Sequence, residues 1–203
     1  MCMKKWLIGI DEAGRGPLAG PVAVGVACVA SGFDWSTLTG VDDSKKLTPQ
    51  HREEIYELAM HLNAEERLFF GVMLTSASYI DRYGITKAVT RGISHTLLRL
   101  HRSNGIAPND SKVLLDGLLR APKAYADQTT IIGGDGKEKI IGLASILAKV
   151  TRDRFMEQLA QKEAYRAYRF EQHKGYGTVL HRALIKEFGL CDMHRRTFCG
   201  KLS

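Results

Sequence analysis

Apolar residues gather along the chain into five short runs that have the length of β-strands. Residues 6–11 and 21–30 are almost continuously apolar, which is typical of strands buried on both faces of a sheet. A Gly- and Pro-rich turn from Gly14 to Pro21 joins these two runs. The five predicted strands are residues 6–11, 21–30, 67–75, 113–116 and 129–132.

Segments with helical periodicity follow and alternate with the later strands. Thr48-Pro49 places an N-cap residue before a proline at the first helical position, which predicts a helix to about Leu62. The other predicted helices are residues 76–83, 86–101, 139–161 and 178–188. Their expected apolar stripes are Ile93, Leu97, Leu98 and Leu100 in one helix, and Ile140, Leu143, Leu147, Val150 and Leu159 in another. The pattern predicts an α/β fold with a mixed sheet of about five strands covered by helices.

Composition and length bound the domain organisation. The 203 residues are 44% hydrophobic and 25% charged, which is typical of a soluble globular protein. The sequence has no repeat and no linker-like tract, so we expect one domain over residues 1–203. Asp11 and Glu12 interrupt the first apolar run, which excludes a signal peptide. The four cysteines lack zinc-site spacing and favour a cytoplasmic location, with Cys28 as a reduced core thiol.

Positive charge is concentrated near the C-terminus. Residues 149–203 contain 12 Lys and Arg against 6 Asp and Glu, and so supply six of the seven excess positive charges. Residues from about 160 to 203 are expected to form a basic, helical C-terminal extension. A basic segment of this kind suits either the phosphate backbone of a nucleic acid or a solvated surface.

Three of the predicted strands end in acidic residues. Ile8-Gly9-Ile10 leads into Asp11-Glu12, Val113-Leu114-Leu115 leads into Asp116, and Ile131-Ile132 leads through two glycines into Asp135. Ligand-binding groups commonly lie at strand ends in such sheets, so neighbouring strands would bring the four carboxylates together. A single Asp after a strand is as well explained by a turn or a helix N-cap.

Clustered carboxylates repel one another and stay ionised only when cations neutralise them. Oxygen ligands without Cys or His favour Mg²⁺ or Mn²⁺ over Zn²⁺. Two such ions about 4 Å apart hold the attacking and leaving oxygens of a phosphoryl displacement. The carboxylates therefore predict metal-dependent chemistry, and the basic segment suggests a phosphodiester substrate.

Six segments occur in an order that is specific to one enzyme family. They are Asp11-Glu12-Ala13-Gly14-Arg15-Gly16-Pro17 with Ala19-Gly20-Pro21-Val22, Asp42-Asp43-Ser44-Lys45-Lys46-Leu47, Leu115-Asp116-Gly117, Gly134-Asp135 with residues 144–154, His173-Lys174-Gly175-Tyr176-Gly177-Thr178, and His194-Arg195-Arg196-Thr197-Phe198. Together they resemble the type 2 ribonucleases H (ribonuclease HII) from residue 8 to 198. Residues 79–92 and 136–143 differ from the family pattern without removing a carboxylate.

The resemblance implies a ribonuclease-H-like fold with a C-terminal helical extension. It implies an endonuclease that cuts the RNA strand of RNA–DNA hybrids and cuts 5′ of ribonucleotides embedded in duplex DNA, in ribonucleotide excision during DNA replication and repair. It assigns two Mn²⁺ or Mg²⁺ ions to Asp11, Glu12, Asp116 and Asp135. It assigns substrate binding to Gly14, Arg15, Gly16 and Tyr176. We expect a monomer with nucleic-acid substrates and no membrane partner.

Several alternatives remain open from the sequence. A 3′–5′ exonuclease would share the carboxylates but would not require Gly14-Arg15-Gly16 or Tyr176. A type 3 ribonuclease H would carry an N-terminal substrate-binding domain, and only ten residues precede Asp11. A catalytically inactive hybrid-binding protein would not need all four carboxylates. Lys46 suits a phosphate contact or solvated charge, and Asp153 suits a helix-surface pair with Lys149 or support of the metal site.

Three histidines have no metal-ligand spacing in the sequence. They are His173, His181 and His194. We expect His181 on a helix surface and His194 in a structural role, and we expect Trp6 and Trp35 to be packing residues.

Overall fold

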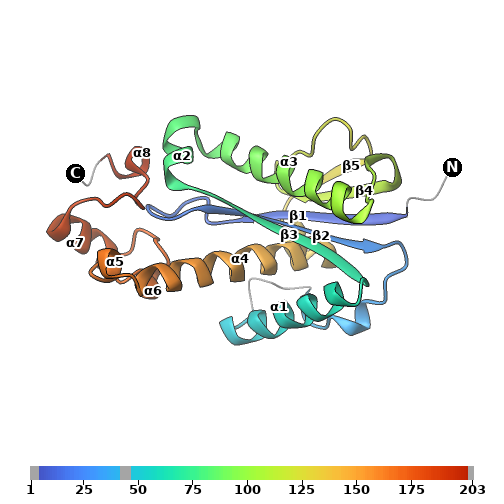
Figure 1. Ribbon diagram of the computed structural model, residues 1–203, viewed down its shortest axis with the longest axis horizontal. Coiled ribbons are helices and arrows are strands. Elements are labelled where there is room, and N and C mark those ends of the chain that lie inside the picture. The colour runs from blue at the N-terminus through green and yellow to red at the C-terminus, as the bar shows by residue number, and fades with distance from the viewer. Residues whose placement is uncertain (1–4, 42–46, 201–203) are drawn as a thin grey trace.

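A computed structural model describes residues 5–41 and 47–200 (Figure 1). Five strands form one sheet in the order β3-β2-β1-β4-β5. They are β1 (Trp6–Ala13), β2 (Val22–Ala30), β3 (Leu68–Thr75), β4 (Ser111–Asp116) and β5 (Gln128–Ile131). The first three pair antiparallel, whereas β4 is parallel to both β1 and β5. The predicted mixed five-stranded sheet is confirmed.

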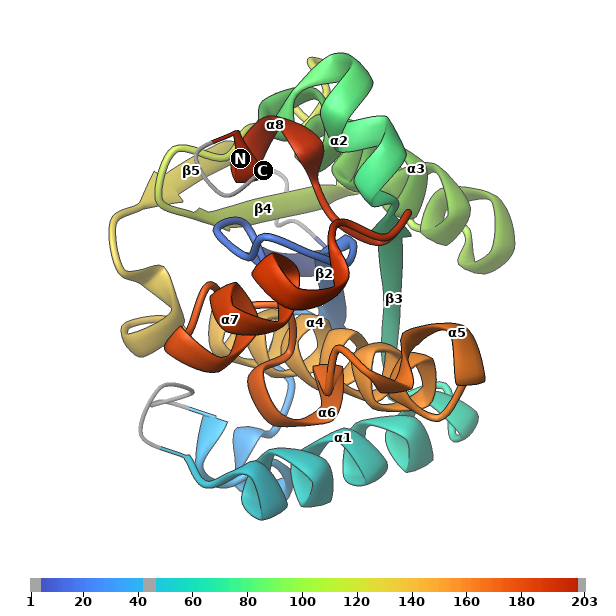
Figure 2. The ribbon, with the colours of Figure 1, turned by 90° about the vertical axis from the view of Figure 1, so that its left-hand side faces the viewer.

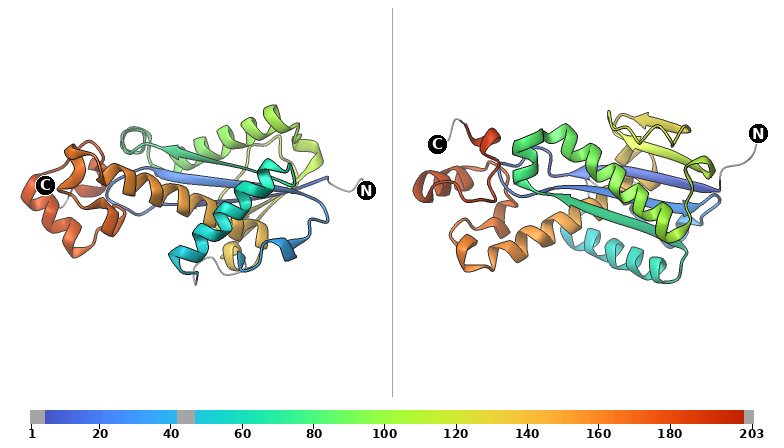
Figure 3. Two further views of the ribbon diagram at one scale, coloured as in Figure 1. Left: turned by 60° about the horizontal axis from the view of Figure 1, so that its bottom comes forward. Right: turned by 45° about the horizontal axis from the view of Figure 1, so that its top comes forward.

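Helices cover both faces of this sheet (Figure 1, Figure 3). The long helices are α1 (Pro49–Ala64), α3 (Ile85–Asn104) and α4 (Lys139–Ala160), and α2 is Ala77–Tyr83. One face packs against α3, and the other packs against α4, with α1 outside α4. The shorter helices are η1 (Trp35–Thr37), η3 (Pro108–Asp110), η4 (Gly134–Gly136), α5 (Glu163–Arg166), α6 (Phe170–His173), α7 (Val179–Phe188) and α8 (Arg196–Cys199).

Side-chain patterns account for these boundaries. Thr48 caps α1 by accepting a hydrogen bond from the His51 N–H at 3.2 Å, and Pro49 occupies the first turn, as predicted. The predicted α4 stripe is buried throughout, and Cys28 is a buried free thiol. Trp6 is partly buried against the core, as expected for a packing residue. The expectation for Leu98 is wrong, because its side chain is 46% exposed and the buried stripe of α3 is narrower than predicted.

Two glycines let α4 lie unusually close to the sheet. A Cβ on Gly9 would stand 2.2 Å from the carbonyl oxygen of Ile140, and one on Gly25 would stand 2.2 Å from that of Ala144. Either side chain would push the helix away from the sheet. α4 therefore packs directly against β1 and β2.

The C-terminal helices gather at the end of the sheet where β1 finishes, as Figure 2 shows. Met156 and Leu159 of α4 pack there with Tyr168 and Phe170 in a separate apolar cluster. Asp81 of α2 accepts hydrogen bonds from the first backbone N–H groups of α8, at 2.8 and 3.0 Å. Within the described ranges, no helix is both long and apolar enough to cross a membrane.

Candidate active site

Strand register brings three of the predicted carboxylates to one edge of the sheet. Ile10 of β1 lies opposite Leu115 of β4, so Asp11 and Asp116 follow at the same level. Asp116 lies opposite Ile131 of β5, from which the chain turns through η4 to Asp135. β1 continues to Ala13, so Glu12 as well as Asp11 lies inside the strand, which extends the predicted boundary at residue 11.

These side chains line a cavity of about 490 Å³ beside α4. Its wall also contains residues from the β1–β2 turn, from α1 and α4, and from the turn after α6. The lining residues are Asp11, Glu12, Ala13, Gly14, Arg15, Gly16, Arg52, Asp116, Asp135, Ser145, Ile146, Lys149 and Tyr176. All predicted site residues except Lys46 therefore meet in one cavity, and Lys46 lies outside the described residues.

Burial and mutual repulsion act on the carboxylates. Burial raises the pKa of Asp11 to about 7, the Ser145 hydroxyl opposes the rise by a hydrogen bond, and the charges of Glu12 and Asp116 add to it. Burial also raises the pKa of Glu12, against the effect of Arg15, whose Nη1 donates to Glu12 Oε1 at 3.1 Å. The site therefore holds negative charge that its own neighbours leave incompletely balanced.

The donor set suits a hard divalent cation. Asp116 Oδ1 accepts from the Gly134 N–H at 2.6 Å, which fixes one carboxylate at the strand end. Glu12 Oε2 is buried and has no hydrogen-bond partner among the described residues. In the same parts of the chain, no three acidic, His or Cys side chains form a ready-made cation cage. The fit therefore rests on the oxygen-only donors and on the unpartnered buried carboxylate oxygen.

The two glycines of Gly14-Arg15-Gly16 differ in whether the protein around them leaves room for a side chain. Gly14 has φ of 85°, and a Cβ there would stand 2.0 Å from Nε of Arg152. Gly16 is exposed, and a Cβ there would meet no described residue within 4 Å. Packing and backbone conformation therefore demand glycine at position 14, whereas no contact among residues 5–41 and 47–200 demands it at position 16.

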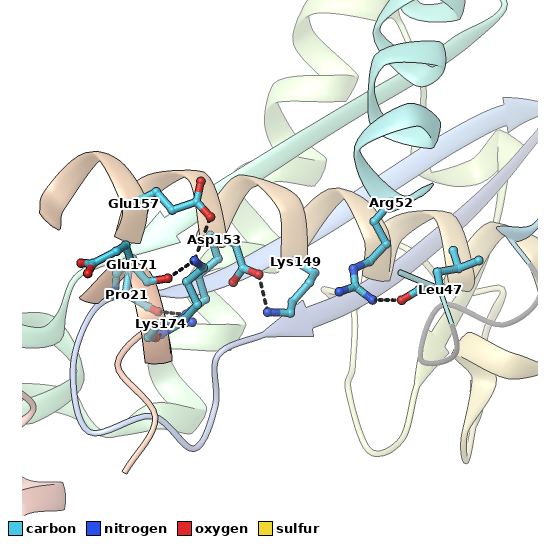
Figure 4. Close-up of polar contacts among 9 residues, drawn as sticks. Pro21, Leu47, Arg52, Lys149, Asp153, Glu157, Glu171 and Lys174 are labelled. Carbon is cyan, nitrogen blue, oxygen red and sulfur yellow. Dashed lines mark hydrogen bonds and ion pairs between the residues drawn. The ribbon is translucent and has the colours of Figure 1, made fainter. Parts of the chain in front are cut away.

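Tyr176 and Lys149 line the cavity from two elements, the turn between α6 and α7 and the helix α4. Tyr176 is 41% exposed, and the guanidinium carbon of Arg152 lies 5.6 Å from its ring centroid. Lys149 donates to Asp153 Oδ2 at 2.5 Å, which forms the predicted pair (Figure 4). Both side chains of this pair are partly buried instead of lying on an open helix surface. Lys149 therefore links Asp153 to the cavity wall.

Comparisons with known proteins identify the family to which this chain belongs. A family model described as Ribonuclease HII matches residues 8–201. The chain belongs to the ribonuclease HII family. A ribonuclease HII of Geotalea daltonii is 43% identical over 96% of this chain and 82% of its own length. That of Ruminiclostridium cellulolyticum is 39% identical over 95% of this chain and 69% of its own.

Solved structures of ribonucleases H share the fold of this ribonuclease HII family member. The ribonuclease H2 of Pyrococcus horikoshii superposes with a TM-score of 0.68 at 25% identity, over 97% of this chain and 96% of its own. Bst-RNase HIII in complex with Mn²⁺ superposes with a TM-score of 0.67 at 19% identity, over 92% and 64%. The chain is accordingly a type 2 ribonuclease H, a hydrolase of a family that acts on RNA–DNA hybrids.

Beneath Tyr176, this ribonuclease HII chain brings together three histidines that are far apart in the sequence. His181 Nδ1 lies 2.9 Å from the Tyr176 carbonyl oxygen, which only accepts, so Nδ1 carries the hydrogen. His194 Nε2 donates to His181 Nε2 at 3.1 Å, and His194 Nδ1 accepts from the Cys191 N–H at 3.0 Å. The ring of His173 stacks on that of His181. These three neutral imidazole rings, joined by hydrogen bonds and stacking, support the turn that carries Tyr176.

The expectation that His181 lies on a helix surface is wrong, because its side chain is fully buried. Its partners, Tyr176 and His194, come from outside α7, so periodicity within the helix carried no signal for this contact. Ser145, Lys149 and Arg52 were also missed as cavity residues. Ser145 and Lys149 are four residues apart on α4, and this polar spacing within the otherwise apolar stretch 140–150 was the available signal.

Stability is expected to fall as the pH is lowered from about 6.5 toward 4. Burial lowers the pKa of both His181 and His194 to about 4, whereas unperturbed histidine titrates near ~6.5. Between these values the unfolded chain binds protons that the folded chain does not, so the folded state loses stability. Across this pH window, the free energy of unfolding of wild type should therefore fall by up to a few kcal/mol more than that of His181→Gln. Thermal unfolding at several pH values measures the difference.

Asp11 acts in the opposite direction in the same experiment. Its folded-state pKa of about 7 exceeds its ordinary value of 3.8, so protonation below pH 7 favours the folded state. Both proteins contain Asp11, and the difference between their curves isolates the contribution of His181. The exposed His101→Gln serves as the control and should keep the wild-type slope. Parallel curves for wild type and His181→Gln would contradict the prediction.

Proposed function

We propose that this protein is a divalent-metal-dependent endonuclease. It cuts the RNA strand of RNA–DNA hybrids and also cuts 5′ of a ribonucleotide embedded in duplex DNA, leaving 3′-hydroxyl and 5′-phosphate ends. The observation that carries the proposal is the meeting of Asp11, Glu12, Asp116 and Asp135 with the Gly14-Arg15-Gly16 turn in one cavity. Acidic metal ligands and a glycine turn beside them suit cleavage next to a ribose.

The four carboxylates are proposed to hold two divalent cations, Mn²⁺ or Mg²⁺. When bound, these ions supply an activated water and stabilise the charge that develops on the phosphate. Asp116 is held at the end of β4 by the Gly134 N–H, and Asp11 is held by Ser145, so both ligands are oriented in advance. The Mn²⁺ bound by Bst-RNase HIII, which has the same fold, supports this choice of ion.

Recognition of the ribose is proposed to fall to the glycine turn and Tyr176. The 2′-hydroxyl is the group that distinguishes RNA from DNA at a given position. Gly16 lies open at the cavity, so a sugar is able to approach its backbone closely. The half-exposed guanidinium of Arg15 suits a neighbouring phosphate, and the exposed ring of Tyr176 suits stacking against the next sugar.

A cleavage assay on three matched duplexes tests the proposal. One duplex is all DNA, one contains a single ribonucleotide and one is a continuous hybrid, each incubated over a titration of Mn²⁺ and of Mg²⁺. We expect no cut in the first, a single cut 5′ of the ribonucleotide in the second and many cuts in the third. Mass spectrometry of the products should show 3′-hydroxyl and 5′-phosphate ends, and chelation of the metal should stop the reaction.

The same assay separates the competing functions. A ladder that shortens from one end would indicate a 3′–5′ exonuclease, and hybrid binding without any product would indicate an inactive binding protein. Cleavage of the continuous hybrid without the single cut would restrict the activity to long hybrids. Full activity after complete chelation would overturn the metal-dependent mechanism.

A further inference from the structure

Two fully buried arginines hold the turn between β1 and β2 by its carbonyl oxygens. Arg195 donates from Nη2 to Gly14, from Nη1 to Arg15 and from Nε to Gly20, at 2.7, 2.9 and 3.0 Å. Arg152 donates from Nε to Pro21 at 2.9 Å and from Nη2 to Ala19 at 3.2 Å. The Arg195 N–H donates to Leu18 at 2.7 Å. Six of the eight carbonyls from Gly14 to Pro21 therefore point at these two residues.

This arrangement fixes the direction of the backbone N–H groups as well. A trans peptide is planar, and its C=O and N–H bonds point in opposite directions. The peptide unit made of the Gly14 C=O and the Arg15 N–H points its oxygen at Arg195. The next unit, made of the Arg15 C=O and the Gly16 N–H, does the same. The N–H groups of Arg15 and Gly16 consequently point away from Arg195. Both residues line the cavity that contains the carboxylates.

We infer that Arg195 is a positioning residue that directs the N–H groups of Arg15 and Gly16 toward the ribose of the substrate. The inference deepens the proposed function and rests on it for the identity of the sugar. The proposed role concerns orientation, since Arg195 is fully buried and reaches the substrate only through the turn. Two aligned N–H donors form a fixed site for an oxygen atom, in the way that an oxyanion hole does.

The geometry explains why this position carries arginine. The guanidinium is a rigid planar fork, and here three different nitrogens reach three different carbonyls. A lysine ammonium is a single point on a flexible stem and cannot hold the Gly14 and Arg15 carbonyls in the same fixed relation. The ring of Phe198 lies 5.2 Å from the guanidinium carbon and supports the fork from one side.

Amide NMR of ¹⁵N-labelled protein tests the orientation without relying on cleavage. In wild type, adding a duplex with one ribonucleotide should shift the Arg15 and Gly16 amide resonances more than adding the matched all-DNA duplex. In Arg195→Lys, the free protein should already show altered or broadened resonances for these two amides, and the difference between the duplexes should disappear. Unchanged Arg15 and Gly16 resonances in folded Arg195→Lys would overturn the inference.

Kinetics then separates positioning from stability. Arg195→Lys should lower cleavage of the single-ribonucleotide duplex by about tenfold to a hundredfold per folded molecule, mainly through kcat. Leu97→Ala is the matched control, because Leu97 is buried on the α3 face of the sheet, opposite α4, and its truncation should lower the unfolding temperature without touching the turn. That variant should keep the wild-type rate per folded molecule. Equal losses in the two variants would assign Arg195 a merely structural role.

A second variant covers the case in which Arg195→Lys does not fold. Phe198→Leu keeps Arg195 but removes the ring beside its guanidinium, and it should reduce cleavage in the same direction by a smaller factor. If Arg195→Lys does not fold, the inference is overturned when Phe198→Leu shows both the wild-type cleavage rate and unchanged Arg15 and Gly16 amide resonances. Wild type that cuts none of the duplexes would refute the proposed function, while the amide resonances of free protein would still decide the orientation.

Discussion

Asp116→Asn is expected to lower the cleavage rate by about three orders of magnitude, because cation stabilisation of the phosphate supplies several kcal/mol. Asn keeps the shape of Asp and an oxygen able to accept from the Gly134 N–H, but it lacks the charge that holds a divalent ion. Hybrid affinity depends mainly on phosphate contacts and should stay within about threefold of wild type. Single-turnover cleavage and binding measured on the same duplex check both statements.

A matched control lies at the other end of the same strand. Asp110 immediately precedes β4, forms an ion pair with Lys5 at 4.0 Å and is outside the cavity. Asp110→Asn should therefore cut at the wild-type rate. Asp116→Asn should unfold at the wild-type temperature or above it, since it relieves repulsion with Asp11. A wild-type rate for Asp116→Asn at saturating Mg²⁺ and Mn²⁺ would remove Asp116 from the metal site.

Gly16→Ala is expected to fold normally and to lose about tenfold to a hundredfold of its cleavage of the single-ribonucleotide duplex. The added methyl group meets no atom within 4 Å in the part of the chain that the structure describes, so stability should change by less than about 1 kcal/mol. The same methyl group would stand where the proposed substrate sugar approaches the backbone. Thermal unfolding and cleavage per folded molecule are the two measurements required.

Gly14→Ala is the contrasting variant in the same turn. Its φ of 85° and the nearby Nε of Arg152 both oppose a side chain, so this variant should lose more than about 1 kcal/mol of stability. Gly14→Ala thus reports a structural defect and Gly16→Ala a defect in substrate approach. Should Gly16→Ala remain folded and cut at the wild-type rate, the substrate does not come close to residue 16.

Sequence periodicity was sufficient for the five strands and the longer helices, because burial of an apolar face decides where these elements form, but it did not predict the short helices η1, η3, η4, α5, α6 and α8 individually. The α4 stripe shows this best, since every residue predicted in it is buried. The pairing of β1 with β4 could not be predicted from local sequence patterns, because the two strands are separated by about half of the chain. The carboxylate cluster depended on that pairing, so the sequence offered it only as a hypothesis conditional on neighbouring strands.

Contacts that join distant segments account for what the sequence did not reveal. His181 has the appearance of a polar surface residue on a short helix, and only its partners outside that helix make its burial favourable. Arg152 and Arg195 lie within two of the family motifs, but the sequence indicates no role for either. Their hydrogen bonds go to backbone carbonyls, which any residue type supplies, so no spacing of side chains indicates them.

The arginine contacts also constrain the order in which the protein is built during synthesis. Arg195 follows Gly14 by 181 residues, and its hydrogen bond to that residue closes almost the entire chain into one loop. Ribosomes deliver the carboxylates of β1 well before Arg195, so the turn cannot take its final form until residue 195 has been synthesised. A nascent chain would therefore carry its acidic residues well before it has the oriented N–H groups beside them. Maturation of the cavity is thus tied by topology to the synthesis of residue 195.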